Sequence, residues 1–254
     1  MATLARLVNR SLSLVGLRLQ RVAAEAGSKS GSAKPFYAPH ETCQIPELAS
    51  LYRLFLGERR NGFFVEVGAY DGISFSNTSC LADVGWSGLL IEPIPAYAEA
   101  CRVRYHGNGR LRVVETAVGA SRSSIEISVA GSLTTTNRGL LDAYRNISWA
   151  RHAVKQTTTL TVDLRTLDEI LETEGVSAPI DVLSVDVEGG EAGVFAGLTL
   201  PRWRPRLVVA ELVHTHPDLF RISAGDAQLQ RSIEREGYSV VYKDSINTVF
   251  AADA

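Results

Sequence analysis

Acidic side chains stand at the ends of two apolar runs early in the chain. The first run, Phe63–Val67, carries Glu66 and passes into the Gly-rich turn 68–72, which also holds Asp71. About 20 residues past this turn Glu92 ends the second run, where a carboxylate can accept hydrogen bonds from both hydroxyls of a ribose. The spacing E-x-G-x-x-x-G departs from the G-x-G-x-x-G of a diphosphate cradle, and acids repel phosphate. The pattern therefore favours S-adenosylmethionine, which carries a sulfonium and an ammonium but no phosphate.

A second pair of acids, Asp186 and Glu188, ends the apolar run 180–187. Side chains alternate along a strand, so the two carboxylates are expected on one side of it and close together. Paired carboxylates raise the pKa of one member, which suits a general base. We expect Asp186 or Glu188 to take the proton from an acceptor hydroxyl during an in-line methyl transfer.

Three further candidate side chains stand at or just after the end of the apolar run 206–212, namely Glu211, His214 and His216. A histidine after a strand can act as a base near neutral pH, and His214 is kept as the third catalytic candidate. No metal site is expected, although the acidic pair described above could hold a divalent cation together with a third ligand.

From about residue 40 the chain alternates strand-like and helix-like segments. Strands are expected over 63–67, 89–91, 111–118, 124–129, 160–162, 180–187, 206–212, 239–242 and 247–251. Helices are expected over 46–57, 77–84, 95–105, 167–172, 191–198 and 229–237. Repeated strand–helix units predict an α/β fold with a mainly parallel sheet and helices on both faces. The terminal antiparallel hairpin fits the seven-stranded, class I (Rossmann-like) methyltransferase variant of this plan.

The stretch 131–156 is polar and aromatic and lacks clean periodicity. We interpret it as a mobile insertion or lid. Its Tyr144, Trp149 and Arg151 could stack on a sugar ring, or they could pack within the lid itself.

Several blocks of the sequence resemble one family. They are 62–72, Ser76-Asn77-Thr78, 85–93, Thr166-Leu167-Asp168, and 182–189 followed by Glu191. Taken together they resemble the FkbM-type methyltransferases over roughly residues 44–252. The stretch 44–47 departs from the Q-x-G-E/Q-D run that members often carry there, so no role is transferred to it.

The resemblance implies a class I methyltransferase that acts mostly on hydroxyl oxygens, often of sugars or polyketide-derived metabolites. It also implies that the cofactor site is lined by Glu66, Gly68, Asp71, Gly72 and Glu92. Residues near these strand ends complete the expected set of cofactor contacts: Ala69, Asn77, Thr78, Pro93 and Ala117.

The composition excludes several other classes of protein. With 254 residues, 21% charged residues and a net charge of −2, nothing marks the chain as a nucleic-acid binder. The three cysteines are far apart and form no C-x-x-C, which argues against a zinc knuckle or a disulfide framework and favours a reducing compartment. No uncharged apolar run reaches the roughly 18 residues of a membrane span.

The first 39 residues differ from the rest, and we predict that they precede a single domain of residues 40–254. They hold six basic residues against one acid, and the apolar residues of 4–22 recur at helical spacing. Three interpretations stay open: a basic amphipathic helix on an anionic membrane surface, a mitochondrial transit peptide, or a helix docked on the domain's own apolar surface. The first would place a cytoplasmic enzyme at the inner face of a membrane.

The sequence therefore predicts an S-adenosylmethionine-dependent O-methyltransferase acting on a hydroxyl of a sugar, glycan or glycosylated metabolite. One rival is a nicotinamide-dependent oxidoreductase, which shares the strand, the turn and the distal acid. Another is a non-catalytic binding module in a glycan assembly system. The spacing within 68–72 argues against the first rival, and the complete set of cofactor acids argues against the second.

Overall fold

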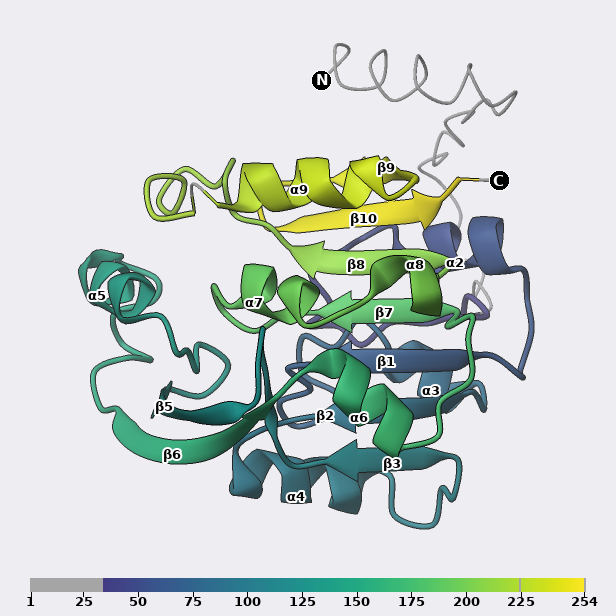
Figure 1. Ribbon diagram of the computed structural model, residues 1–254, viewed down its shortest axis with the longest axis horizontal. Coiled ribbons are helices and arrows are strands. Elements are labelled where there is room, and N and C mark those ends of the chain that lie inside the picture. Colours follow the sequence, from purple (N-terminus) through teal and green to yellow (C-terminus); the bar gives the residue numbers. More distant parts are fainter. Residues whose placement is uncertain (1–33, 224, 254) are drawn as a thin grey trace, which may run out of the picture. The chain divides into compact units, whose positions relative to one another are not determined.

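The computed structural model describes residues 34–223 and 225–253 (Figure 1). Its helices are α2 (Leu48–Leu56), α3 (Ser79–Asp83), α4 (Pro95–Arg104), α5 (Arg138–Asn146), α6 (Leu167–Thr173), α7 (Glu191–Ala196), α8 (Leu200–Trp203) and α9 (Asp226–Arg235). Its strands are β1 (Phe63–Val67), β2 (Ser87–Ile91), β3 (Leu111–Val114), β4 (Ala117–Val118), β5 (Ser123–Val129), β6 (Thr158–Arg165), β7 (Val182–Val185), β8 (Leu207–Glu211), β9 (Tyr238–Lys243) and β10 (Asn247–Ala252). None of the helices in these ranges has both the length and the apolar character needed to cross a membrane.

Seven strands form the main sheet in the order β3-β2-β1-β7-β8-β10-β9. The first five are parallel to their neighbours, whereas β10 runs antiparallel to both β8 and β9. The order reverses between β1 and β7, and open α/β sheets bind their ligands at the carboxyl ends of such a switch point. This topology confirms the predicted class I, Rossmann-like sheet with its antiparallel C-terminal hairpin.

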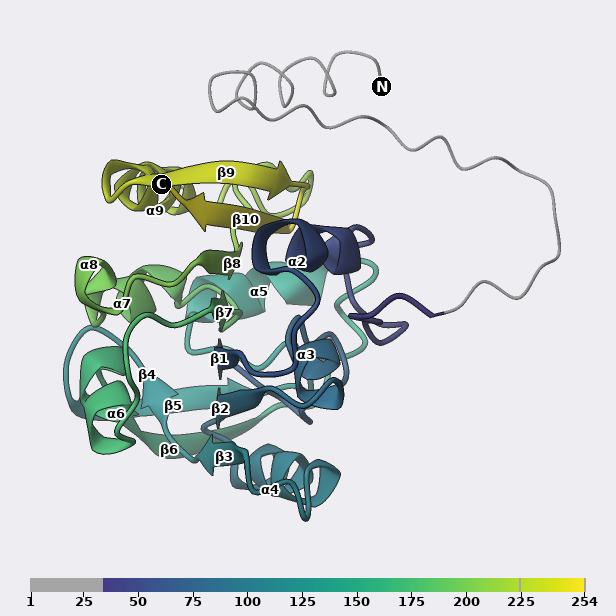
Figure 2. The same ribbon diagram turned by 90° about the vertical axis from the view of Figure 1, so that its right-hand side faces the viewer.

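Helices cover both faces of the sheet (Figure 2). Helices α2, α3 and α4 lie on one face, and α6, α7 and α8 lie on the other. Alternation along β1 serves both cores, because Phe64 packs toward the first group of helices and Val65 and Val67 toward the second. All three side chains are buried, which explains why β1 reads as a continuous apolar run.

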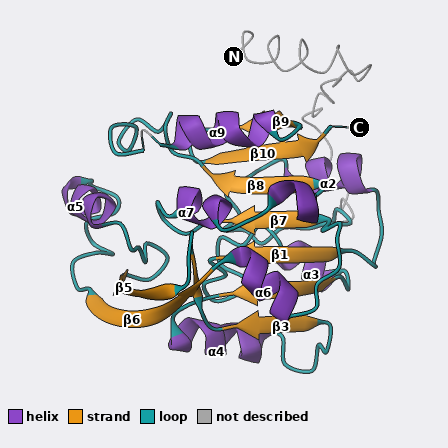
Figure 3. Cartoon of the chain, in the orientation of Figure 1, coloured by secondary structure: helices purple, strands orange, loops and turns teal. Residues whose placement is uncertain are grey.

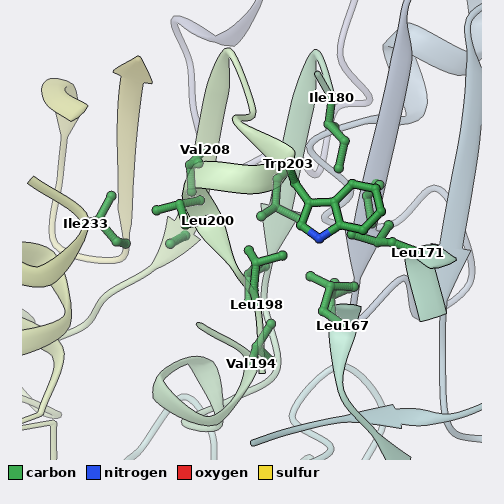
Figure 4. Close-up of a cluster of buried hydrophobic side chains, with 14 of the residues drawn as sticks. Leu167, Leu171, Ile180, Val194, Leu198, Leu200, Trp203, Val208 and Ile233 are labelled. Carbon is green, nitrogen blue, oxygen red and sulfur yellow. The ribbon is translucent and has the colours of Figure 1, made fainter. Parts of the chain in front are cut away.

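The core beneath α6 to α9 gathers around Trp203 (Figure 4). Its indole N–H donates a hydrogen bond of 2.7 Å to Asp168 Oδ1, so the one polar atom of the ring is satisfied. Asp168 lies in the first turn of α6, which begins with a capping box made by Thr166 and Glu169. The "T-L-D" element of the sequence therefore starts a helix and anchors this core.

The segment 111–118, predicted as one strand, forms two. Residues 111–114 join the main sheet as β3, and residues 117–118 pair with β6 in a second sheet of order β4-β6-β5. The long antiparallel pairing of β5 with β6 draws the chain away from the main sheet at this point. Both β5 and β6 lie beyond the carboxyl ends of the parallel strands (Figure 1).

The stretch 131–156, interpreted from its lack of clean periodicity as a mobile insertion or lid, contains α5 (Figure 3). The side chain of Asn137 caps this helix by accepting the N–H of Leu140. Leu140, Leu141 and Tyr144 then bury one face of α5 in a small third core, which also includes Val213 and Leu219 from the chain after β8. We call residues 130–157, between β5 and β6, the β5–β6 connection.

Residues 1–33, which include the predicted amphipathic helix 4–22, lie outside the described residues. Tyr37 is buried, and its hydroxyl donates a 2.6 Å hydrogen bond to the carbonyl of Gly57. Part of the chain before residue 40 thus packs on the fold, whereas the boundary after residue 39 stays a prediction.

Candidate active site

Two cavities adjoin each other at the carboxyl ends of β1, β2, β7 and β8. The strand-end cavity is lined by Glu66, Gly68, Ala69, Tyr70, Ser74, Phe75, Ser76, Asn77, Glu92, Pro93, Tyr97, Ile127, Gly131, Ser132, Thr134, Ser184, Asp186, Val187 and Glu188. The lid cavity is lined by Gln44, Phe75, Ser132, Leu133, Tyr144, Trp149, Ala153, Asp186, Glu188, Glu211, Val213, His216, Leu219 and Ile246. Four residues line both: Phe75, Ser132, Asp186 and Glu188. The fold therefore provides two adjacent binding spaces with a common wall.

The turn after β1 brings the backbone close to the end of β7. The N–H of Gly68 donates to the carbonyl of Ile91 at 2.9 Å, and Gly68 has a φ of +86°. A Cβ at this position would lie 1.7 Å from the carbonyl oxygen of Asp186, so only glycine fits. Gly68 and Ala69 both line the strand-end cavity.

Glu66 is 4% exposed and fastens β1 to the loop before α3. Its carboxylate accepts hydrogen bonds from the hydroxyls of Ser76 and Thr78, at 2.8 Å each, and from the N–H of Asn77 at 3.2 Å. Burial raises the pKa of Glu66 to about 7, although these three hydrogen bonds lower it. Glu66 and Asn77 line the cavity, but the carboxylate is already occupied by the protein's own donors.

Four residues expected in the cofactor set lie outside the lining of the strand-end cavity: Asp71, Gly72, Thr78 and Ala117. The Oδ1 of Asp71 accepts the N–H groups of Ile73 and Ser74 at 3.0 and 2.7 Å, so this acid shapes the turn. Gly72 packs against Tyr105, Thr78 is fully buried on Glu66, and Ala117 is buried in β4. The expectation that these residues face the cavity is not met.

Glu92 is the acid at the end of β2, and it is 4% exposed. Its Oε2 accepts the N–H of Tyr70 and its Oε1 accepts the N–H of Ile94, both at 2.9 Å. Burial raises the pKa of Glu92 to about 7, and these two hydrogen bonds partly oppose the rise. Within the described ranges each oxygen has one protein donor, so lone pairs remain for a ligand in the cavity.

The carboxylates of Asp186, Glu188 and Glu211 approach one another at the common wall, with ligand atoms within 4.8 Å of each other. Burial raises the pKa of all three carboxyl groups. The charges of neighbouring carboxylates, Asp186 among them, raise the pKa of Glu188 and Glu211 further. The group therefore holds protons more readily than ordinary carboxylates do. Three carboxylates at this spacing are also a geometry that divalent cations bind.

The sequence predicts that alternation along one strand brings Asp186 and Glu188 together, and this prediction is wrong. Strand β7 ends at Val185, and Glu188 occupies a left-handed turn with a φ of 53°. The turn is held by Glu191, whose Oε1 accepts the N–H groups of Val187 and Gly189 at 3.0 and 3.3 Å. Burial raises the pKa of Glu191 to about 8. Glu191 thus positions the turn that carries Glu188. The sequence indicates Glu191 only as part of a family motif and assigns it no role.

The β5–β6 connection also contacts the turn that carries Glu188. The hydroxyl of Tyr144 donates to the carboxylate of Glu188, and the hydroxyl of Thr135 donates to the Glu188 carbonyl at 2.6 Å. A Cβ on Gly189 would lie 3.0 Å from Leu140, so α5 packs directly on the turn. The lid and the acidic turn are therefore built against each other.

His214, the third catalytic candidate, lies outside the lining of both cavities, so the structure does not bring it together with Asp186 and Glu188. Its Nε2 lies 2.7 Å from the Nζ of Lys243 on β9. Burial lowers the pKa of His214, and the positive charge of Lys243 lowers it further. The chain turns after β8 so that Val213 and His216 face the lid cavity instead.

Among the described residues, the polar lining of the two cavities contains acids, hydroxyls and amides but neither lysine nor arginine, and His216 is the single histidine. A dinucleotide brings phosphates that need donors or cations, so it fits this chemistry poorly. S-adenosylmethionine brings a ribose for Glu92 and positive charge for an acidic surface, so it fits. The lid cavity, about 390 Å³, is large enough for a small acceptor, with Tyr144 and Trp149 among its walls.

These buried acids predict that the ligand-free protein loses stability as the pH rises. The pKa values of Glu66 and Glu92 are about 7 when folded against 4.5 as their ordinary value, so the folded chain binds more protons than the unfolded chain. Stability is therefore greatest below pH 4.5 for these groups and falls until the pH passes 7. Between pH 6 and pH 8 each contributes a loss of about 1.4 kcal/mol.

Urea unfolding of the ligand-free protein at pH 6 and pH 8 measures this loss. The midpoint is expected to be lower at pH 8, and Glu92→Gln is expected to reduce the difference. An equal or higher midpoint at pH 8 would show that the acids are not desolvated as the structure has them.

One family model and several solved structures are similar to this chain. Residues 66–240 match the model of the methyltransferase FkbM domain. Among solved structures, the chain is similar to the O-methyltransferase TomG of Streptomyces achromogenes in complex with SAM (16% identity, 82% of this chain and 78% of the other, TM-score 0.45). It is also similar to an O-methyltransferase of Bacillus cereus in complex with SAH (14% identity, 98% and 90%, TM-score 0.46). The search of curated proteins returned no match.

The sheet order, the antiparallel last hairpin and the acidic strand-end cavity define a class I S-adenosylmethionine-dependent methyltransferase. The match extends over more than two thirds of the sequence, and the chain belongs to the FkbM methyltransferase family. This family membership supports a methyltransferase enzyme over the two alternative functions, a nicotinamide-dependent oxidoreductase and a non-catalytic binding module.

Proposed function

We propose that the chain methylates a hydroxyl oxygen of a sugar, glycan or glycosylated metabolite that binds in the lid cavity. The observation that carries this proposal is the common wall of the two cavities, where Asp186 and Glu188 stand. A donor in the strand-end cavity and an acceptor in the lid cavity would meet at this wall. Proximity and alignment of the reacting groups supply much of the rate in such a displacement.

The residues of the strand-end cavity would hold the methyl donor by its ribose. Glu92 would accept hydrogen bonds from the ribose, and the rings of Tyr70 and Tyr97, 4.7 Å apart, offer a surface beside it. Bound S-adenosylmethionine supplies an electrophilic methyl group. The protein's part is to orient the acceptor oxygen and to remove its proton.

Asp186 or Glu188 would take that proton, as carboxylates whose pKa values lie above the ordinary range. A hydroxyl needs such help because it is a weak nucleophile while protonated, whereas a neutral amine is nucleophilic enough to attack before it loses a proton. A base at the transfer point therefore favours oxygen as the methylated atom. Glu211 adjoins the pair and can share the proton.

The acceptor proposed here is hydroxyl-rich and free of negative charge. Carboxylates on one side of the lid cavity can accept hydrogen bonds from several hydroxyls, and the aromatic walls Tyr144 and Trp149 can pack on the apolar face of a sugar ring. Phosphate or carboxylate groups on the acceptor would be repelled by Asp186, Glu188 and Glu211, because the part of this lining that the structure describes contains no lysine or arginine.

The test is transfer of labelled methyl from S-adenosylmethionine to fractionated extracts of small molecules, polysaccharides and lipids, with and without EDTA. Label in a neutral, hydroxylated fraction, stable to the mild base that cleaves methyl esters, would support the proposal. Binding of S-adenosylhomocysteine in calorimetry without label in any fraction, or label on nitrogen or carboxyl groups, would overturn it. Loss of transfer in EDTA would indicate that the three carboxylates work around a cation.

We also propose that the enzyme works at a membrane surface, which it contacts through residues 4–22. Labelled lipid-linked glycans would agree with a peripheral enzyme at a membrane. Flotation of the full chain with anionic vesicles tests that contact directly, and a chain starting at residue 34 is the matched control.

A further inference from the structure

Strained backbone is concentrated at the candidate active site. Within the described ranges, four residues other than glycine have φ in the left-handed region: Tyr70 (48°), Phe75 (62°), Glu188 (53°) and Arg204 (38°). The first three line the strand-end cavity, whereas Arg204 ends helix α8. Bulky side chains rarely adopt this backbone, and it persists where surrounding contacts enforce it and a function uses it.

Phe75 stands apart from the other two strained residues by its position and chemistry. Of the described residues, it is the one aromatic residue that lines both cavities, on the same common wall as Asp186 and Glu188. Its side chain is 39% exposed, so the ring forms a surface for a ligand rather than part of the hydrophobic core. A ring in this place would contact both reactants where the methyl group passes.

The backbone of Phe75 is held from a segment that precedes the family match. Its N–H donates to the hydroxyl oxygen of Thr42 at 2.8 Å, and that oxygen lies 2.8 Å from Nδ1 of His40. Close by, the hydroxyl of Tyr52 donates to the carbonyl of Asn77 at 2.6 Å and secures the far end of the same loop. The match to the FkbM domain begins only at residue 66.

The same segment also forms part of the acceptor side of the site. Gln44, two residues after Thr42, lines the lid cavity and accepts a 3.2 Å hydrogen bond from the side-chain amide of Asn247. Residues 40–44 therefore supply a wall of the lid cavity and the bond that holds Phe75. Nothing in the lining of the strand-end cavity comes from this segment.

We propose that Phe75 is an acceptor-positioning residue and that the Thr42 hydroxyl sets its place, so that residues 40–44 tune transfer rather than cofactor binding. The inference rests on the proposed function, because it assigns the lid cavity to the acceptor. A Phe75 ring shifted by the loss of one hydrogen bond would misalign the acceptor oxygen and the methyl group. Displacements of about 1 Å can cost up to about 10²-fold in rate.

The test compares Thr42→Val, which keeps the shape but removes the hydroxyl, with Thr42→Ser, which keeps the hydroxyl. Thr42→Val is expected to lower kcat/KM for the labelled extract fraction by about 10-fold or more, and Thr42→Ser to stay within about 2-fold of the wild type. The dissociation constant of S-adenosylhomocysteine is expected to change by less than about 3-fold in both. Phe75→Leu, which keeps an apolar side chain, should reproduce the kinetic loss and serves if Thr42→Val does not fold.

Equal kinetics in Thr42→Val and Thr42→Ser would overturn the inference. So would a loss of S-adenosylhomocysteine affinity that matches the loss of kcat/KM, because Phe75 would then serve the cofactor. A wild-type protein that binds S-adenosylhomocysteine but labels no fraction contradicts the proposed function instead, and the two failures are therefore distinguishable.

Discussion

Replacing Glu188 with glutamine is expected to lower kcat by about 10²- to 10⁴-fold, the usual contribution of a positioned general base. Glutamine keeps the size of the side chain and can still accept the hydroxyl of Tyr144, so the turn should keep its shape. Asp186→Asn is the second arm, because both carboxylates stand on the common wall. The larger loss identifies the base.

Glu126→Gln is the matched control for this change. Glu126 lies on β5, is exposed and pairs only with exposed Arg138, so its loss should leave kcat unchanged. Calorimetry with S-adenosylhomocysteine should give dissociation constants within about 3-fold of the wild type for all three variants. If Glu188→Gln and Asp186→Asn each keep more than about a tenth of the activity, the acids orient the acceptor and do not act as the base.

The pH dependence of kcat provides an independent measure of the same group. Burial and the charge of Asp186 raise the pKa of Glu188 well above its ordinary value. A base acts only when deprotonated, so kcat should rise with pH and level off above the pKa values of the cluster. In the variant that lacks the base this rise should disappear.

The strand ends could be predicted because the local pattern determines them. The run Phe63–Val67 is apolar and bounded by Gly62 and Gly68, and it forms β1 with those bounds. What each acid does at its strand end depends on distant partners, which periodicity does not describe. Glu66 binds the loop 76–78, whereas Glu92 retains free lone pairs, and only the folded chain distinguishes them.

The acidic turn shows how a correct expectation can rest on the wrong geometry. Asp186 and Glu188 do lie together, but they are brought there by a left-handed turn after β7 and not by strand alternation. Two successive glycines, 189 and 190, mark that turn in the sequence and were a usable signal. The third carboxylate, Glu211, arrives only because β8 pairs with β7.

Two other differences between the sequence-based expectations and the structure, at His214 and at helix α5, have the same physical origin. His214 follows a strand as predicted, but the chain turns after β8 and the ring meets Lys243, 29 residues later. Helix α5 has a cap at Asn137 that the sequence displays, yet its apolar face packs on residues far along the chain, such as Val213 and Leu219. Contacts between distant segments decide both cases, and a single sequence does not reveal them.

The second large effect is expected at Glu92, where glutamine should weaken binding of S-adenosylhomocysteine by about 10²-fold. Hydrogen bonds to a charged group contribute about 1.5–3 kcal/mol each, and every 1.4 kcal/mol is a factor of ten in affinity. Glu115→Gln is the matched control, because Glu115 follows β3 as Glu92 follows β2 but is exposed and paired with Arg102. The dissociation constant of S-adenosylhomocysteine should be the same for Glu115→Gln as for the wild type.

The pKa of Glu92 makes this prediction sharper. In the ligand-free protein it is about 7, raised by burial, and ribose hydroxyls donate best to the ionised form. Binding should therefore release a proton, and the affinity of the wild type should rise about tenfold between pH 6 and pH 8. Glu92→Gln should remove most of this rise, since no proton leaves the amide. If the variant keeps both the affinity and its pH dependence, Glu92 only holds the N–H groups of Tyr70 and Ile94, and the ribose must bind elsewhere.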